Sequence, residues 1–210
     1  MKDAQGDPAY GRTNWRRFAV AAVVPTAAAG ALIFGMANGA FAASFTVSGQ
    51  SFKISADRLE GTGFAQYGGF DTKKDGTKIP VAVSGIAAAE LTNLCQSVKT
   101  PGLPVVLTIR AGREAGKPAS ATDLLIGVNE LSGDAKFTDI NIGQDASTLG
   151  LGGKNAHGEA GGFGQEAKKV TITGLKQTAV STTAGTFTLN GLNLKVNLPD
   201  ANGNAPAECF

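Results

Sequence analysis

Histidine, cysteine and charge are all scarce in this chain of 210 residues, and each shortage excludes a class of protein. The one histidine, His157, cannot build a site that needs two histidines as metal ligands or catalytic partners. Two cysteines are too few for a scaffold of several disulfides. A net charge of +2 and an apolar fraction of 42% exclude a disordered, highly charged chain.

The first 42 residues have the pattern of an export signal. Four basic residues, the last of them Arg17, precede an uncharged run, 18–43, which ends just after the string Ala-Phe-Ala. A basic segment, an apolar segment and an A-x-A site are typical of a secretory signal peptide. We therefore expect cleavage after Ala42 and export of residues 43–210 as a single domain. The alternative is an uncleaved membrane anchor, since the run reaches roughly the 20 residues that span a bilayer.

The part that we expect to be exported has no net charge. Four of the 19 basic residues and two of the 17 acidic residues lie in the first 42, so 15 of each remain. No more than two basic residues are adjacent there, as at Lys73-Lys74. Because nucleic-acid binding needs a basic face with several phosphate contacts, we expect no nucleic-acid partner.

Cys95 and Cys209 both lie in this part of the chain. An even number of cysteines outside the cytoplasm favours a disulfide, which would tie the C-terminus to the body of the domain. In the chain-entropy model, closing so long a loop stabilises the fold by roughly 4–5 kcal/mol. The alternative is a pair of separate thiols.

Alternation of apolar and polar residues predicts that the exported part is mainly β. Only residues 86–94 could instead form a short helix. We predict a single antiparallel, β-sandwich-like domain, with an irregular β-solenoid as the alternative. Three segments, 89–94, 135–140 and 169–175, resemble one another but do not recur with the fixed period that a regular solenoid would need. The expected strands lie within 45–54, a hairpin with its turn at 49–50, and within 80–94, 105–109, 137–142, 170–175 and 187–198.

Two glycine-rich segments stand out. Residues 149–168 contain seven glycines and are expected to form a mobile surface loop. Residues 61–70 interleave glycines with aromatic residues, a pattern that favours a bent or bulged strand with its aromatic side chains in the core. The functional alternative is a ridge that contacts carbohydrate or lipid through Phe64, Tyr67 and Phe70.

No catalytic or metal-binding constellation is found in the sequence. His157 is the only histidine that could serve as the base of a serine hydrolase, and we expect it to be an exposed loop residue. The G-x-S-x-G string of many hydrolases is missing. Residues 71–76 look like a calcium loop, but Lys73 occupies a ligand position, so they predict a hairpin turn. We therefore expect no catalytic residue, metal or cofactor.

Several strings occur here in an order that resembles a known family. The most specific are L-T-N-L-C-Q at 91–96 and G-T-G-F-A-Q-Y-G-G at 61–69. They resemble small secreted actinobacterial proteins of unknown function, best known from streptomycetes, over essentially the whole chain. Some members carry the label cholesterol esterase, and members are often accompanied by a small multi-pass membrane protein. The resemblance implies a cell-surface setting, with an envelope lipid or that membrane protein as the partner.

Two functions follow from these observations. The first is a secreted or cell-envelope β-rich protein with a structural or apolar-ligand-binding role. The alternative is an extracellular lipid or sterol ester hydrolase, which the resemblance alone implies.

Overall fold

Long strands of alternating residues build most of the chain that the computed structural model describes, residues 50–73, 75–200 and 204–210. The expected signal and cleavage site, the start of the expected 45–54 strand and its turn lie outside these residues. Contacts divide the chain into the units Met1–Thr46 and Val47–Phe210, and the description below concerns the second. Within the described residues, no helix is long and apolar enough to cross a membrane.

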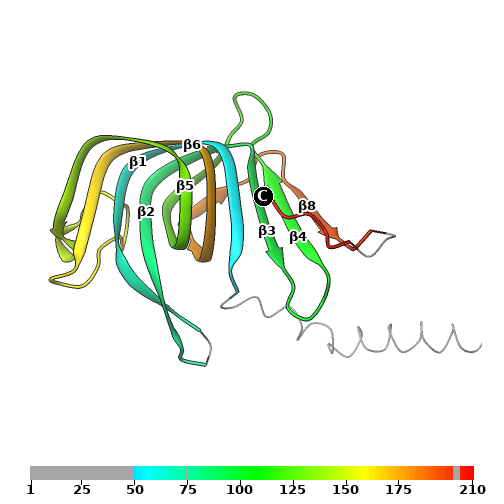
Figure 1. Ribbon diagram of the computed structural model, residues 1–210. Helices are drawn as coiled ribbons and strands as arrows, with labels where there is room; N and C mark the ends of the chain where they lie inside the picture. The colour runs from blue at the N-terminus through cyan, green and yellow to red at the C-terminus, as the bar shows by residue number, and fades with distance from the viewer. Residues whose placement is uncertain (1–49, 74, 201–203) are drawn as a thin grey trace, which may run out of the picture. The chain divides into compact units, whose positions relative to one another are not determined.

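The described part is mainly β, which confirms the predicted fold class (Figure 1). Residues 86–94, which could have formed a short helix, belong instead to two strands. The elements are β1 (Phe52–Thr72), β2 (Lys78–Thr92), β3 (Leu94–Lys99), β4 (Val106–Ala111), β5 (Ala119–Asp145), the 3-10 helix η2 (Ala146–Thr148), β6 (Phe163–Thr183), β7 (Thr186–Thr188) and β8 (Asn193–Asn197).

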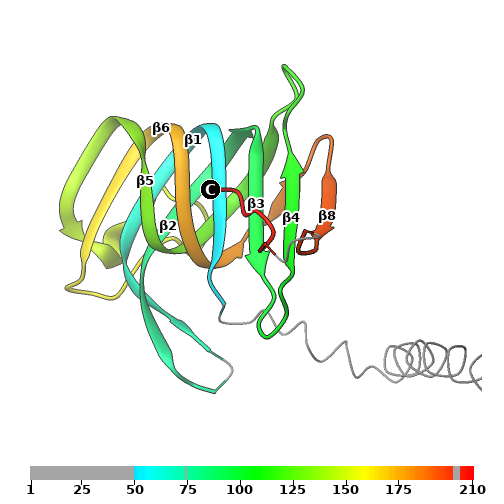
Figure 2. The ribbon, with the colours of Figure 1, turned by 45° about the vertical axis from the view of Figure 1, so that its right-hand side comes forward.

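All strand pairs are antiparallel and belong to one hydrogen-bonded sheet in the order β2-β5-β6-β1-β3-β4-β8, with β7 paired to β5. The four longest strands are β1, β2, β5 and β6. Because β2 pairs with β1 as well as with β5, each of these four strands lies between two others of the four. We call β1, β2, β5 and β6 the core strands, and β3, β4 and β8 the extension. Figures 1 and 2 show the core strands curving around a common interior, with the extension continuing the sheet beyond β1.

Apolar side chains from all four core strands fill this interior. Leu59 of β1, for example, lies opposite Leu91 of β2 and Ile172 of β6, and all three are at most 5% exposed. Burial of such side chains is the main force that holds the sheet in this shape. The interior cluster also includes Phe64, Ile86, Leu124, Ile126, Val128, Val170 and Leu175.

Five short strings explain how the long strands bend around this interior. Each has threonine at its second position and asparagine, aspartate or glycine at its third, and each third residue has a positive φ of 48–69°. Asparagine, aspartate and glycine adopt this conformation more readily than other residues. As a result, the first and fourth residues both face the interior while the threonine is exposed. The strings occupy residues 61–64, 91–94, 121–124, 137–140 and 172–175.

Gly63, the third residue of the first string, shows why a side chain is excluded there. Its φ is +69°, and a Cβ at this position would collide with the Leu151 carbonyl oxygen and approach the Ala87 Cβ to 3.0 Å. The bend at Gly63 turns Phe64 into the interior, where its ring packs 5.2 Å from that of Phe137. The glycine-rich segment 61–70 is thus a bent strand, as the sequence predicted. The expected burial of its aromatic side chains holds for Phe64 and Tyr67 but is wrong for Phe70, which is 68% exposed.

Candidate functional site

The second glycine-rich segment corrects the prediction of a mobile loop over 149–168. β6 begins at Phe163, and the preceding residues 149–162 pack on the outer face of β1 instead of standing free. Leu149 and Ala156 are at most 6% exposed and form a small second core with Ala65, Tyr67 and Ala146. Glycine permits this close approach, because a Cβ at Gly152 would lie only 2.6 Å from the Ala65 Cβ.

Two carboxylates hold the segment in place. Glu166 accepts hydrogen bonds from the backbone N–H groups of Gly150 and Leu151, at 2.9 and 3.1 Å. Asp123 accepts one from the N–H of Lys154 at 3.0 Å. Hydrogen bonds to charged acceptors are among the stronger ones in proteins, so the segment is fastened to both β6 and β5.

A groove of about 870 Å³ lies between this segment and the β1–β2 hairpin. That volume is within the range of roughly 300–1,000 Å³ that is typical of small-molecule sites. Tyr67, Val81, Val83 and Leu125 give the groove an apolar wall. The remaining lining residues include Phe70, Asp71, Lys78, Ser147, His157, Glu159, Ser181 and Thr183.

The three aromatic residues singled out from the sequence do not form one ridge. Phe64 faces the interior and is 5% exposed, whereas Tyr67 and Phe70 both line the groove. Tyr67 is 9% exposed and burial raises the pKa of its hydroxyl, while Phe70 is 68% exposed. The Lys78 ammonium lies 5.8 Å from the centre of the Phe70 ring. The groove therefore has an aromatic floor and an aromatic rim.

His157 and Ser147 line the same groove, which the sequence did not indicate. His157 is exposed, as predicted. The Ser147 hydroxyl donates to the Asp145 carboxylate at 2.7 Å and not to His157. This bond, the Ser147 N–H and the Gly161 N–H together lower the pKa of Asp145. The Ser–His hydrogen bond of a catalytic triad is thus not formed in this structure.

The expected hairpin turn at 71–76 is confirmed. The Asp75 carboxylate accepts a hydrogen bond from the Thr77 N–H at 2.9 Å, which lowers the pKa of Asp75. The Gly76 N–H donates to the Lys73 carbonyl at 2.9 Å, which closes the turn. Across the described residues, no group of three His, Cys, Asp or Glu side chains could hold a metal ion.

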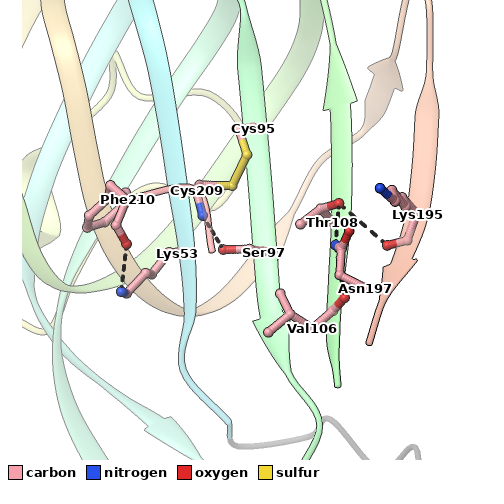
Figure 3. Close-up of a disulfide and its surroundings, with 9 residues drawn as sticks. All are labelled: Lys53, Cys95, Ser97, Val106, Thr108, Lys195, Asn197, Cys209 and Phe210. Carbon is pink, nitrogen blue, oxygen red and sulfur yellow. Dashed lines mark hydrogen bonds between the residues drawn. A yellow bond between two sulfur atoms is a disulfide. The ribbon is translucent and has the colours of Figure 1, made fainter. Parts of the chain in front are cut away.

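The predicted disulfide between Cys95 and Cys209 is confirmed (Figure 3). It joins β3 to the end of the chain across a sequence separation of 114 residues. The Cys209 N–H donates to the Ser97 hydroxyl at 3.0 Å, and the Phe210 carbonyl accepts from the Lys53 ammonium at 2.8 Å. The last residues of the chain are therefore bound to β1 and β3.

A family model matches residues 48–210, which include every strand, both cysteines and the groove. The chain belongs to DUF6230, a family of unknown function. No curated protein and no solved structure matches the chain. The expected membership in a family of unknown function is confirmed, and the actinobacterial origin and the cholesterol esterase label stay predictions.

The two strings that carried the resemblance have structural roles in this DUF6230 chain. L-T-N-L-C-Q contains the bend at Asn93 and the disulfide cysteine Cys95. G-T-G-F-A-Q-Y-G-G contains the bend at Gly63 and the groove residue Tyr67. Both strings thus determine the shape of the fold, and one of them also builds the candidate site.

Proposed function

We propose that this protein is an exported component of the cell envelope that binds the apolar part of a lipid-like ligand in the groove beside Tyr67 and Phe70. The observation that carries the proposal is the exposed Phe70 ring at the rim of a groove with an apolar wall. Concave apolar sites with a few polar groups are the usual form of ligand pockets. A purely structural role would need no such groove.

The proposed location is supported by the disulfide and by the sequence pattern of the first 42 residues. Disulfides persist mainly in oxidising compartments outside the cytoplasm, and the Cys95–Cys209 bond is compatible with such a compartment. The proposed partner is an envelope lipid. A small multi-pass membrane protein, which the family resemblance implies, is the alternative partner.

Ligand binding can be tested by fluorescence titration of the exported chain. The probe is cis-parinaric acid, a fatty acid that fluoresces when bound. We expect Phe70→Ser to weaken binding about tenfold, the effect of losing part of the contact area of one aromatic ring. Phe163→Ser is the matched control, because Phe163 is 62% exposed and lies outside the groove. Equal binding by both variants and the unchanged protein would contradict the proposal.

A second candidate function is hydrolysis of a lipid or sterol ester in the same groove, which the shared lining by Ser147 and His157 favours. Turnover of a short-chain nitrophenyl ester and of a cholesteryl ester tests it. A hydrolase of the triad type would lose several orders of magnitude in turnover in His157→Ala. We expect no turnover above a heat-denatured control, and unchanged folding of His157→Ala.

A further inference from the structure

The two faces of the extension differ in what covers them. Register pairs place Ser97, Thr108 and Lys195 in one row on the first face, and Val98, Leu107 and Val196 in one row on the other. The C-terminal segment 206–209 crosses the first face, where Cys209 is bonded to Cys95 and to Ser97 (Figure 3). Between this segment and strands β4 and β8 lies a pocket of about 320 Å³.

Two cations line this pocket, Arg110 of β4 and Lys195 of β8. Arg110 lies opposite Asn193 and Lys195 lies opposite Thr108, so the two cations are diagonal neighbours on one face. Diagonal positions in an antiparallel pair are roughly 7–8 Å apart, which long side chains can bridge. The register therefore directs both positive charges to the same small pocket.

Within the described residues, neither cation belongs to an ion pair. Six ion pairs join side chains of the described residues, and none of them includes Arg110 or Lys195. Two like charges in one concave site repel each other, and an anion between them would remove that repulsion.

Glu208, the acidic residue in the lining, is already engaged. Its carboxylate lies 3.3 Å from the Lys53 ammonium and 2.8 Å from that of Lys99, and neither lysine lines the pocket. Burial alone would raise the pKa of Glu208, but the hydrogen bonds from these two lysines lower it overall. The charges of Arg110 and Lys195 therefore stay available to a ligand.

The floor of the pocket is polar and fixed. The Asn197 amide donates to the Thr108 hydroxyl at 3.1 Å and to the Val106 carbonyl at 3.2 Å, and the Thr108 hydroxyl donates to the Lys195 carbonyl at 3.4 Å (Figure 3). These bonds hold β4 and β8 in the register that brings the two cations together. Asn193 adds a further polar side chain to the lining, and Leu198, Pro206 and Ala207 give it an apolar edge.

We propose that this pocket binds a phosphate group, held by the Arg110 guanidinium and the Lys195 ammonium, with Asn193 beside them. An arginine fork and a lysine point charge are the usual pair of groups for a tetrahedral oxyanion. The apolar edge from Leu198 to Ala207 suits a phosphate ester with an organic group more than a bare ion. Inorganic phosphate and an anionic phospholipid headgroup both supply this chemistry.

The test has two arms, both with the full exported chain. In the first, inorganic phosphate is titrated while the side-chain NMR signals of Arg110 and Lys195 are followed. In the second, binding to vesicles of phosphatidylcholine with and without phosphatidylglycerol is measured by flotation. The variants are Arg110→Gln and Lys195→Gln. The control, Lys136→Gln with Lys169→Gln, removes two exposed cations elsewhere and gives the same net charge as both test substitutions together.

We expect phosphate to shift both signals, and each test variant to weaken phosphate binding about tenfold, the effect of losing one charge-assisted hydrogen bond. If the unchanged protein floats with phosphatidylglycerol vesicles and both test variants do not, the bound phosphate belongs to a lipid headgroup. A phosphate response without flotation identifies it as a soluble phosphate ester. No response to phosphate in the first arm would overturn the proposal, as would an equal loss of binding in the control. Unchanged melting temperatures show that the variants are folded.

Discussion

The core strands and the extension are held by different forces. Each core strand has long-strand neighbours on both sides and contributes buried side chains to one interior. The extension has strands of only five or six residues, and β8 at its edge exposes Leu194 by 58% and Val196 by 52% on one face. Its other face is closed by the disulfide and by the ion pairs of Glu208. Packing therefore holds the core strands, whereas the extension, which adds only Leu94 and Ala111 to the interior cluster, is also held by a covalent bond and ion pairs.

Removal of the disulfide tests this difference with the largest expected effect. Cys95→Ala with Cys209→Ala should lower the free energy of unfolding by about 4–5 kcal/mol at most, because the loop that the bond closes is long. Hydrogen exchange of backbone amides should accelerate in β3, β4 and β8 much more than in β6. Equal protection of the extension in both proteins would show that packing alone holds it.

A leucine-to-alanine substitution should lower the free energy of unfolding much more in the core than in the extension. Leu175 is 1% exposed in the core, so Leu175→Ala should lower the free energy of unfolding by about 2–5 kcal/mol. Leu194 is 58% exposed on β8, so Leu194→Ala should change it by less than about 0.5 kcal/mol. Chemical denaturation of both variants measures the two values. Similar losses would mean that the apolar face of β8 is covered in solution.

The bend at Asn93 joins the two regions, since it separates β2 from β3. Its φ is +53°, a conformation that a β-branched residue adopts only under strain. Asn93→Val should therefore lower the free energy of unfolding by about 1–2 kcal/mol. Asn93→Gly should lower the free energy of unfolding much less, because glycine tolerates this φ. That variant lacks only the exposed hydrogen bond that the Asn93 side-chain amide donates to Asp57. Thermal unfolding that ranks the two variants in the opposite order would contradict this account.

The charges of the extension predict the smallest effect, which depends on pH. Because the pKa of Glu208 is lowered in the folded state, its stabilising effect is present above the pKa of the unfolded chain and is lost as the pH falls through the folded value. Glu208→Gln should lower the free energy of unfolding by less than about 1 kcal/mol at neutral pH. Melting temperatures of the two proteins should converge in acid. A difference that persists there would assign the effect to something other than these ion pairs.

Local patterns were sufficient to predict some of these features. Alternation predicted that the chain is mainly β, because a strand buried on one face alternates wherever it lies in the sheet. The expected strand over 187–198 was wrong, since it is divided into β7 and β8, which pair with different strands. Residues 119–136, where no strand was expected, belong to β5. The even number of cysteines predicted the disulfide. Three of the five bending strings were also visible as similar segments, but their shared cause, a positive φ at the third residue, is a backbone property that the similarity alone did not show.

The candidate site was less predictable. Tyr67 and Phe70 were named from the sequence, but Val81, Val83 and Leu125 were not, because nothing local distinguishes them from other strand residues. The glycines of 149–168 predict a mobile loop, but residues 149–162 pack on β1 and 163–168 belong to β6, since glycine suits close packing as well as free loops. The alanines of 149–162, Ala156 among them, were the available signal that this segment could pack against small residues of β1.

The sequence by itself determined the β class, the bends in the strands and the residues able to form the disulfide, because each depends on the conformational and chemical properties of neighbouring residues. Only the tertiary structure decided that β2 pairs with both β1 and β5. It also decided that Phe64 faces the interior while Phe70 faces the groove, and that Arg110 and Lys195 share one pocket. These outcomes depend on the register between strands far apart in the chain, and register is determined by how well whole faces pack together.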